Sequence, residues 1–358
     1  MCRWFAYISM TEDCLLEDVL VTPAHALSKQ VHEHYLPKLL SHDPVVHAEP
    51  TTQAEISERN RLFNVDGFGM AWYTPNLSIF TAPHITTASS PILHPALYKT
   101  IQPPLHDLNF RSICASTASR CVIGHIRAAT STAITPVNNH PFAFGRHTIM
   151  HNGYIADFSR IARQMQNLMS PDAFENLSGR TDTEHFAALY MTYLTFGDGK
   201  AGWEKSYSTQ KMFEAMQHTA NTIVDLQGKT LGEAAQPNDL NICVTDGTQL
   251  VVMRSRNHAT EQPPSLYYSE KAGVTLNRKY PDHPDGAKGS GGPIEGKHAG
   301  DAEGHNPHAQ KEACEHGRHV IVSSEPTTYK DKEWTLIEKN VAVMVGSDGS
   351  VNMKKVIY

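Results

Sequence analysis

The chain opens with Met1-Cys2-Arg3-Trp4-Phe5-Ala6-Tyr7-Ile8-Ser9, and the predicted fold is built around this stretch. Its mixture of aromatic and aliphatic side chains predicts a strand over residues 2–9. If Met1 is removed, Cys2 carries both a thiol and a free α-amino group. The thiolate is the nucleophile of cysteine chemistry, and an α-amino group with a pKa near ~7.7–8.0 can act as a base at neutral pH. One residue can then supply nucleophile and general base together, at a position that the strand would fix.

A cysteine at position 2 can equally have no catalytic role. Features elsewhere in the chain must therefore distinguish a catalytic from a non-catalytic Cys2. The 358 residues suffice for one large domain or two smaller ones, and 40% hydrophobic with 19% charged residues is typical of globular proteins. The net charge of −6 argues against nucleic-acid binding as the main function. No apolar run approaches the ~18–20 residues that span a bilayer, and Glu12 and Asp13 follow too early for a secretory signal. We therefore expect a cytoplasmic protein that binds neither nucleic acid nor membrane.

The cysteines and histidines give no clear metal signature. Six cysteines with irregular spacing and no CxxC pair predict reduced thiols. They are Cys2, Cys14, Cys114, Cys121, Cys243 and Cys314. The 21 histidines are scattered, but His32-Glu33-His34 and residues 297–319 leave open a non-catalytic protein that holds a metal through its histidines. His-rich exposed stretches are more often polar loops, so we expect no metal and no other cofactor.

Strands are predicted in the first part of the chain. Residues 66–73 contain two glycines that suggest a strand entry, and a turn at Pro75-Asn76 would return residues 77–81 as its hairpin partner. Residues 120–129 predict a buried strand, and residues 142–151 predict another.

Helices follow in the middle, over residues 155–168, 181–194 and 206–227, where apolar residues recur at helical spacing. Thr181-Asp182-Thr183-Glu184 is a capping-box start for the second of them. Strands then return, at 241–245, 249–254, 266–269, 319–323, 341–345 and 351–357. Because strands and helices are segregated along the chain, we predict an α+β fold with antiparallel sheets.

Three short motifs carry side chains suited to catalysis. Arg127 ends a predicted strand, where it could be a surface residue or bind a carboxylate bidentately. Asn152-Gly153 could be a turn or an oxyanion hole, since a side-chain amide beside a backbone N–H gives two donors at one place. Asp182 could have no role beyond the helix cap, or it could pair with the ammonium group of a substrate.

Six segments occur in one order along the chain: Met1-Cys2-Arg3, 66–73 (DGFGMAWY), 124–130 (GHIRAAT), 139–142 (NHPF), 151–153 (HNG) and 180–184 (RTDTE). Together they resemble the class II glutamine amidotransferases of the N-terminal-nucleophile hydrolase superfamily. The resemblance spans residues 2 to about 275 and resumes at 321–326 and Trp334.

Cys2-Arg3 resembles the stand-alone branch of the family, whereas synthase-fused members usually begin Cys-Gly. This branch includes the fungal Dug-type subunit of cytosolic glutathione degradation, bacterial YafJ-like proteins and the ergothioneine-pathway γ-glutamyl hydrolase. Length and the aliphatic-poor stretch at 277–318 most resemble the Dug-type protein. The resemblance implies a four-layer αββα sandwich of two antiparallel sheets, formed by a single domain over residues 2–358 with a flexible insertion at 277–318.

The resemblance also implies roles for the catalytic residues. Cys2 matches the nucleophile, with its own α-amino group as base, and Asn152 and Gly153 match the oxyanion hole. Arg127 matches the residue that binds the glutamyl α-carboxylate, and Asp182 the residue that binds the α-ammonium.

Further positions match the substrate pocket. Thr130 matches a substrate-contacting threonine, although many members carry His at the next position, where this chain has Ser131. His140 matches a substrate-binding position near the pocket. His125 and Asp66 are expected to be structural.

The implied reaction is cysteine-dependent hydrolysis of a γ-glutamyl amide bond with release of glutamate from glutathione, glutamine or a related compound. We expect the chain to act in glutathione degradation as the amidotransferase subunit of a complex, with a partner that resembles a metallopeptidase. One alternative is a glutaminase subunit that supplies ammonia to a partner synthase, although no synthase domain is present in this sequence. The other is the non-catalytic His-rich binding protein.

Overall fold

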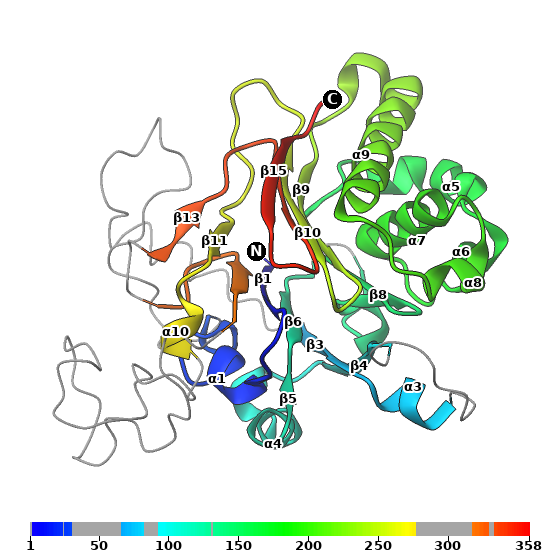
Figure 1. The fold of residues 1–358 in the computed structure, drawn as a ribbon. Helices are drawn as coiled ribbons and strands as arrows, with labels where there is room; N and C mark the ends of the chain where they lie inside the picture. The colour runs from blue at the N-terminus through cyan, green and yellow to red at the C-terminus, as the bar shows by residue number, and fades with distance from the viewer. Residues whose placement is uncertain are drawn as a thin grey trace, which may run out of the picture.

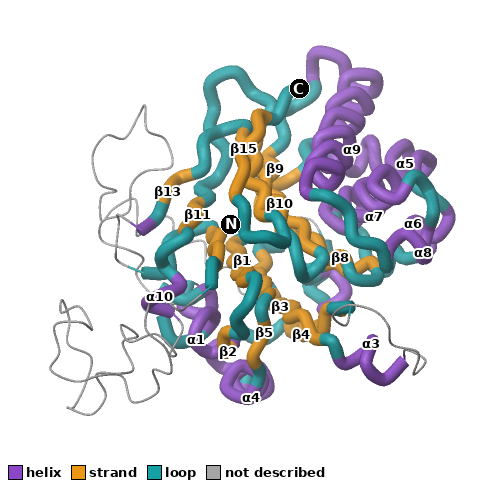
Figure 2. Tube along the Cα trace, viewed as in Figure 1, coloured by secondary structure: helices purple, strands orange, loops and turns teal. Residues whose placement is uncertain are grey.

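The computed structural model describes residues 2–23, 25–30, 66–81, 92–129, 132–276, 317–328 and 333–358. Within these ranges two antiparallel sheets pack face to face, and helices cover both outer faces (Figure 1). Figure 2 shows the strands gathered between two groups of helices. The predicted α+β class and the four-layer αββα sandwich are thus confirmed. The insertion predicted at 277–318 lies almost wholly outside the described residues, and the single domain over residues 2–358 stays a prediction.

The first sheet has seven strands among the described residues, in the order β13-β11-β12-β1-β6-β3-β4. Their bounds are β1 Arg3–Ser9, β3 Gly67–Thr74, β4 His94–Thr100, β6 Cys121–Arg127, β11 Tyr267–Ser269, β12 His319–Ser323 and β13 Thr335–Leu336. β1 lies between β12 and β6, with Phe5 opposite Ser323 on one side and Gly124 on the other. The N-terminal strand is therefore central in the sheet, so residue 2 lies at the end of a strand paired on both edges.

The second sheet has six strands in the described part of the chain, in the order β15-β14-β10-β9-β8-β7. Their bounds are β7 Phe142–Phe144, β8 His147–Tyr154, β9 Asp239–Thr245, β10 Leu250–Arg256, β14 Val341–Val345 and β15 Val351–Lys355. The single strand predicted over residues 142–151 is wrong. Gly145, with φ +54°, turns the chain back so that Phe144 pairs with His147 in a tight hairpin.

Short helices cover the outer face of the first sheet. Their bounds are α1 Leu16–Leu20, α4 Leu108–Ser116 and α10 Gly273–Leu276, beside the 3₁₀ turns η1 Leu27–Lys29 and η2 Pro104–His106 and the small ladder of β2 Cys14–Leu15 with β5 Ala118–Ser119. Leu20 and Phe110 from these helices pack with Phe5 and Phe68 of the sheet. Burial of such aromatic and aliphatic side chains is the main stabilising contribution to this layer.

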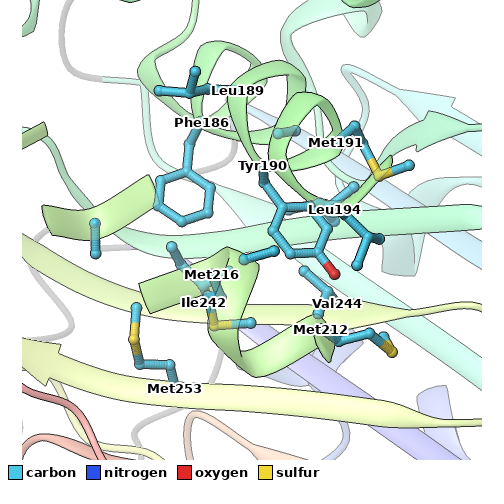
Figure 3. Close-up of a cluster of buried hydrophobic side chains, with 14 of the residues drawn as sticks. Phe186, Leu189, Tyr190, Met191, Leu194, Met212, Met216, Ile242, Val244 and Met253 are labelled. Atoms are coloured by element: carbon cyan, nitrogen blue, oxygen red, sulfur yellow. The ribbon is translucent and has the colours of Figure 1, made fainter. Parts of the chain in front are cut away.

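Longer helices cover the outer face of the second sheet. Their bounds are α5 Phe158–Leu168, α6 Pro171–Glu175, α7 Asp182–Thr195, α8 Gly199–Trp203 and α9 Thr209–Leu231, followed by the 3₁₀ turn η4 Gly232–Ala234. Figure 3 shows Phe186 and Tyr190 of α7 lying over Ile242 and Val244 of β9. Within the described ranges, no helix is long and apolar enough to cross a bilayer.

The space between the sheets is filled by side chains that alternate along the strands. Trp4, Ala6 and Ile8 of β1 belong to this inter-sheet core, whereas Phe5 and Tyr7 face the outer helices. Cys121 and Ile123 of β6 and Met150 of β8 face the same space. Since side chains of alternate residues share a face of a sheet, this pattern fixes the direction of the residues at the strand ends.

The predicted strand at residues 77–81 is wrong, because these residues lie in helix α3, Asn76–Thr81. The N–H of Ile79 donates to the carbonyl of Pro75 at 3.0 Å, which starts a helical turn at the proline. The hairpin partner of β3 is instead β4, with Met70 opposite Tyr98.

Candidate active site

Cys2 lies directly before β1, at one end of the inter-sheet space. The alternation along β1 puts its side chain on the same face as Trp4 and Ala6. The half-buried Sγ accepts a hydrogen bond from the N–H of Ala128 at 3.1 Å and lies 3.7 Å from the carbonyl of the same residue. Ser324 holds the start of the strand, since its N–H donates to the Trp4 carbonyl at 2.9 Å and its Oγ accepts from the Trp4 N–H at 3.0 Å.

Burial raises the pKa of the Cys2 thiol, and Asp182 adds to this effect. The Ala128 N–H and the Arg127 guanidinium act in the opposite direction without cancelling it. The neutral thiol is therefore the resting form, and attack on a carbonyl needs a base that removes its proton. This requirement is what an α-amino group on the same residue would meet.

Arg127 is the last residue of β6 and is almost fully buried. Because Cys121 and Ile123 of the same strand face the inter-sheet core, Arg127 points into that space as well. Its Nη1 donates to the Ala133 carbonyl at 3.0 Å, and its Nη2 donates to the hydroxyl of Thr132.

The charges of the site interact through this guanidinium. Burial lowers the pKa of Arg127, whereas the Asp66 and Asp182 carboxylates and the ionised form of Cys2 oppose the shift. A buried guanidinium with five N–H donors, only some of them used by the loop at 132–133, can bind a carboxylate.

Asn152 and Gly153 lie near the end of β8, where Asn152 is opposite Asn241 of β9. Asn152 is two residues after Met150 and therefore also faces the inter-sheet space. Asn152 is 3% exposed, and its side-chain amide has no hydrogen-bond partner among the residues that the structure describes. Gly153 has φ +144°, and a Cβ at this position would lie 2.1 Å from the carbonyl oxygen of Asp239, so only glycine fits.

The backbone of β8 adds a second donor beside the Asn152 amide. β7 pairs with residues 147–149 only, so beyond Ile149 this edge of β8 is not covered by that strand. The N–H of His151 donates to His140 Nδ1 at 3.3 Å, and the N–H of Ile155 donates to Asp182 Oδ2 at 2.9 Å. Backbone groups of alternate residues point to the same edge, which places the Gly153 N–H between these two bonds.

Asp182 is the first residue of α7 and is half-buried. The predicted helix cap is confirmed, since Thr181 Oγ1 accepts from the N–H of Glu184 at 3.1 Å. Asp182 itself accepts from the N–H of Ile155 through Oδ2 and from the N–H of Thr183 at 2.8 Å through Oδ1. The carboxylate is thus fixed beside Ile155, which is two residues after Gly153. In this position it can accept a hydrogen bond from an ammonium group.

Three histidines hold the backbone just before the Asn152-Gly153 pair. His140 is buried, its ring centroid is 3.9 Å from that of His125, and its Nδ1 accepts from the N–H of His151. The His151 ring has both nitrogens engaged, with Thr183 Oγ1 at 3.0 Å and the carbonyl of Asp239 at 2.7 Å. A direct substrate contact of His140 stays a prediction, as do the roles of the other candidate residues.

Asp66 supports the segment that contacts the thiol, because its Oδ2 accepts from the N–H of Ala129 at 2.7 Å. Thr130 and Ser131 lie outside the described residues. The stretch that motivated a metal site, His32-Glu33-His34, and residues 297–316 lie outside them too. Among the described residues no group of three potential metal ligands is found.

The structure thus brings Cys2, Arg127, Asn152, Gly153 and Asp182 to one end of the sandwich. Sequence reasoning missed the Ala128 N–H, which contacts the sulfur, because a backbone donor leaves no trace in residue identity. It also missed Ser324, although that residue lies in one of the segments that carry the family resemblance.

No protein-family model matches the chain, but individual proteins are similar to it. The probable glutamine amidotransferase DUG3 of Saccharomyces cerevisiae is 26% identical over 344 residues, which is 95% of this chain and 80% of that protein. The glutamine–fructose-6-phosphate aminotransferase of Gluconobacter oxydans is 33% identical over 110 residues, 31% of this chain and 17% of that protein. A solved structure of a glutamine aminotransferase class-II domain protein from Silicibacter pomeroyi matches the whole of both chains with a TM-score of 0.53 and 17% identity, which shows the shared fold.

The predicted resemblance to the class II glutamine amidotransferases is therefore confirmed over nearly the whole chain. The prediction of an enzyme is confirmed as well, since the relatives found are class II glutamine amidotransferases.

Proposed function

We propose that the chain hydrolyses the amide bond of a γ-glutamyl compound and releases glutamate, with Cys2 as the nucleophile. The proposal is carried by the position of the Cys2 sulfur, which accepts a hydrogen bond from the N–H of Ala128, the residue after Arg127, at 3.1 Å. The charges of Arg127 and Asp182 both act on the pKa of this thiol. The α-carbon of a γ-glutamyl group bears a carboxylate and an ammonium. A cation and an anion near a nucleophile match that zwitterionic group.

The reaction begins once Met1 is removed and the α-amino group of Cys2 is free. This amine takes the thiol proton, and Sγ forms a bond to the γ-carbonyl carbon. The tetrahedral oxyanion accepts hydrogen bonds from the Asn152 amide and the Gly153 N–H, a form of stabilisation worth roughly 10²–10³ in rate per donor. The protonated α-amine then gives its proton to the leaving nitrogen as the C–N bond breaks, which leaves a γ-glutamyl thioester on Cys2.

Hydrolysis of the thioester completes the cycle. The α-amine removes a proton from a water molecule, which attacks the thioester carbon while the same donors hold the oxyanion. The C–S bond breaks, the sulfur recovers a proton from the α-ammonium, and glutamate leaves. The five groups of the proposed site supply every proton transfer and charge contact in this scheme.

Arg127 and Asp182 would recognise the glutamyl group and leave the departing amine unspecified. The resemblance to Dug-type subunits favours glutathione as the substrate. It also favours action in the cytoplasm, in a complex with a metallopeptidase-like partner that would process the released dipeptide. A glutaminase subunit that feeds ammonia to a synthase is the second candidate, favoured by the 110-residue match to the glutamine–fructose-6-phosphate aminotransferase.

A substrate panel separates these candidates. The purified full chain is incubated with glutathione, glutamine and other γ-glutamyl peptides, with and without extract of the source organism, and released glutamate is measured. Preferential release from glutathione supports the proposal, and a rise on adding extract supports the partner. Release from glutamine alone favours the glutaminase, and no release from any of the compounds contradicts both. Intact-mass analysis should show that active protein lacks Met1.

A further inference from the structure

A cavity with a volume of about 450 Å³ lies beside β7. It is formed by β4, β7, the 3₁₀ turn η3 (Pro136–Asn138) and the segment that leads into α7. Its volume is in the range of sites that hold small organic molecules, roughly 300–1,000 Å³. None of the proposed catalytic or substrate-binding residues lines it, so it is separate from the site described above.

Lys99 of β4 is the cation of this cavity. It is half-buried, and within the described part of the chain its ammonium forms no hydrogen bond and no ion pair. The nearest favourable contact is the face of the Phe142 ring, with Nζ 4.9 Å from the ring centroid. Burial lowers the pKa of Lys99 to about 8, which shows how poorly the charge is solvated.

The acidic residue of the cavity is already engaged. Glu184 Oε1 accepts from the N–H of Ser178 and Oε2 accepts from the N–H of Gly179, both at 2.8 Å. Glu184 therefore stabilises the turn before α7, and it acts on Lys99 only through long-range electrostatic attraction, without a direct ion pair. A partly desolvated ammonium without a direct counter-ion is a favourable place for an anion from outside.

The remaining walls are mainly apolar. Phe142 and Phe144 of β7 form one side, and Leu97 and Val137, which are 43% and 46% exposed, lie at the mouth. Asn176 and Ser178 add polar groups beside them. A ligand that fits must therefore combine an anionic group with an apolar body.

We propose that this cavity binds a small organic carboxylate with an apolar body, with the carboxylate against Lys99 and the body against Leu97 and Val137. A carboxylate supplies the acceptor oxygens that the ammonium lacks. The body covers apolar surface of Leu97 and Val137 that is otherwise open to solvent. The site goes beyond the proposed hydrolysis and does not depend on it.

The cavity also touches the supports of the catalytic residues. The Phe142 ring lies 5.0 Å from the His140 ring, which holds the His151 N–H. Asn138, at the end of η3, donates to the same Ala133 carbonyl that accepts from Arg127, at 2.9 Å.

The test is calorimetric titration of the full chain with 3-phenylpropanoate, 4-phenylbutanoate and octanoate. We expect saturable one-site binding of at least one of these carboxylates. The affinity of the wild type for the matching neutral amide, and the affinity of the Lys99→Met variant for the carboxylate, should both be at least tenfold lower. The affinity should fall as the pH rises through 8, because the ammonium loses its proton. The amide comparison needs no variant, so it holds even if Lys99→Met fails to fold.

Two outcomes overturn the proposal. One is the absence of saturable binding of all three carboxylates up to about 10 mM, which is weaker than any specific site of this kind. The other is equal binding of the acid and its amide. Both are independent of glutamate release, so a failure of this site and a failure of the proposed hydrolysis are distinguishable.

Discussion

His125 Nε2 donates a hydrogen bond to the carbonyl oxygen of His151 at 2.9 Å, and this bond joins the two sheets at the residue before Asn152. The direction is fixed because a carbonyl can only accept. His140 Nδ1 accepts from the N–H of the same residue, so both backbone groups of His151 are held by imidazole rings in defined tautomers. Protonation of His140 would remove the acceptor that this arrangement needs. The oxyanion donors of the proposed site therefore depend on buried, neutral histidines.

The first prediction concerns stability at low pH. Burial lowers the pKa of His125 to about 3 and that of His140 well below its ordinary value, whereas both would titrate near ~6.5 in the unfolded chain. Below pH 6.5 the unfolded state binds more protons, so this stability is complete above pH 6.5 and is lost as the pH falls. As the pH falls below 6.5, we expect each histidine to reduce the free energy of unfolding by up to about 1.4 kcal/mol for each pH unit.

Urea unfolding between pH 7 and 4 measures this dependence. Carboxylates also titrate in this range, so the comparison is with His125→Gln, which should show a smaller slope. Equal slopes for the wild type and the variant would contradict a neutral buried His125.

The second prediction concerns how His140 acts. Its contacts are with His125, Phe142 and the His151 backbone, which places it behind the oxyanion donors. We expect His140→Ala to lower kcat tenfold or more with little change in KM, because donor placement matters most in the transition state. Steady-state kinetics on the best γ-glutamyl substrate gives the two constants. A raised KM with unchanged kcat would instead indicate direct substrate contact.

The third prediction concerns Arg127 and uses a matched pair of substrates. Glutamine and 4-aminobutanamide differ only in the α-carboxylate. If Arg127 binds that carboxylate, the wild type should favour glutamine in kcat/KM by about 10–150-fold, the value of a charge-assisted bond of roughly 1.5–3 kcal/mol. Arg127→Met should lose this preference. A variant that keeps it would show that the guanidinium serves only the loop at residues 132–133.

The fourth prediction compares two glycines. A Cβ at Gly153 would clash with Asp239, whereas one at Gly228, exposed in α9, would meet nothing within 4 Å. Gly153→Ala should lower the free energy of unfolding by about 1–3 kcal/mol and abolish glutamate release. Gly228→Ala should raise the free energy of unfolding by about 0.5–1 kcal/mol and leave activity unchanged. Thermal unfolding and the glutamate assay on both proteins check this, and an active Gly153→Ala enzyme would argue against the tight approach of β8 to β9.

The four-layer arrangement was implied by the family resemblance, but residue patterns were enough to predict the helix capped by Thr181, the strands that carry Cys2 and Arg127, and the α+β class. These features are local patterns or depend on alternation along one strand. The helix at Asn76–Thr81 was missed because its Leu, Ile and Phe side chains favour a strand, while the proline that starts the helical turn was read as a hairpin turn. The contact of Ala128 with the sulfur and the Lys99 cavity could not be predicted, because they arise from segments far apart in the sequence.

The most direct test of the central proposal is glutamate release by Cys2→Ala, compared with the wild type and with Cys114→Ala. Cys114 is a buried cysteine of α4, which covers the outer face of the first sheet, so its replacement controls for the loss of a thiol. We predict that Cys2→Ala keeps the wild-type fold and releases no glutamate from glutathione or glutamine, while Cys114→Ala remains active. Undiminished release by folded Cys2→Ala would contradict an N-terminal cysteine nucleophile.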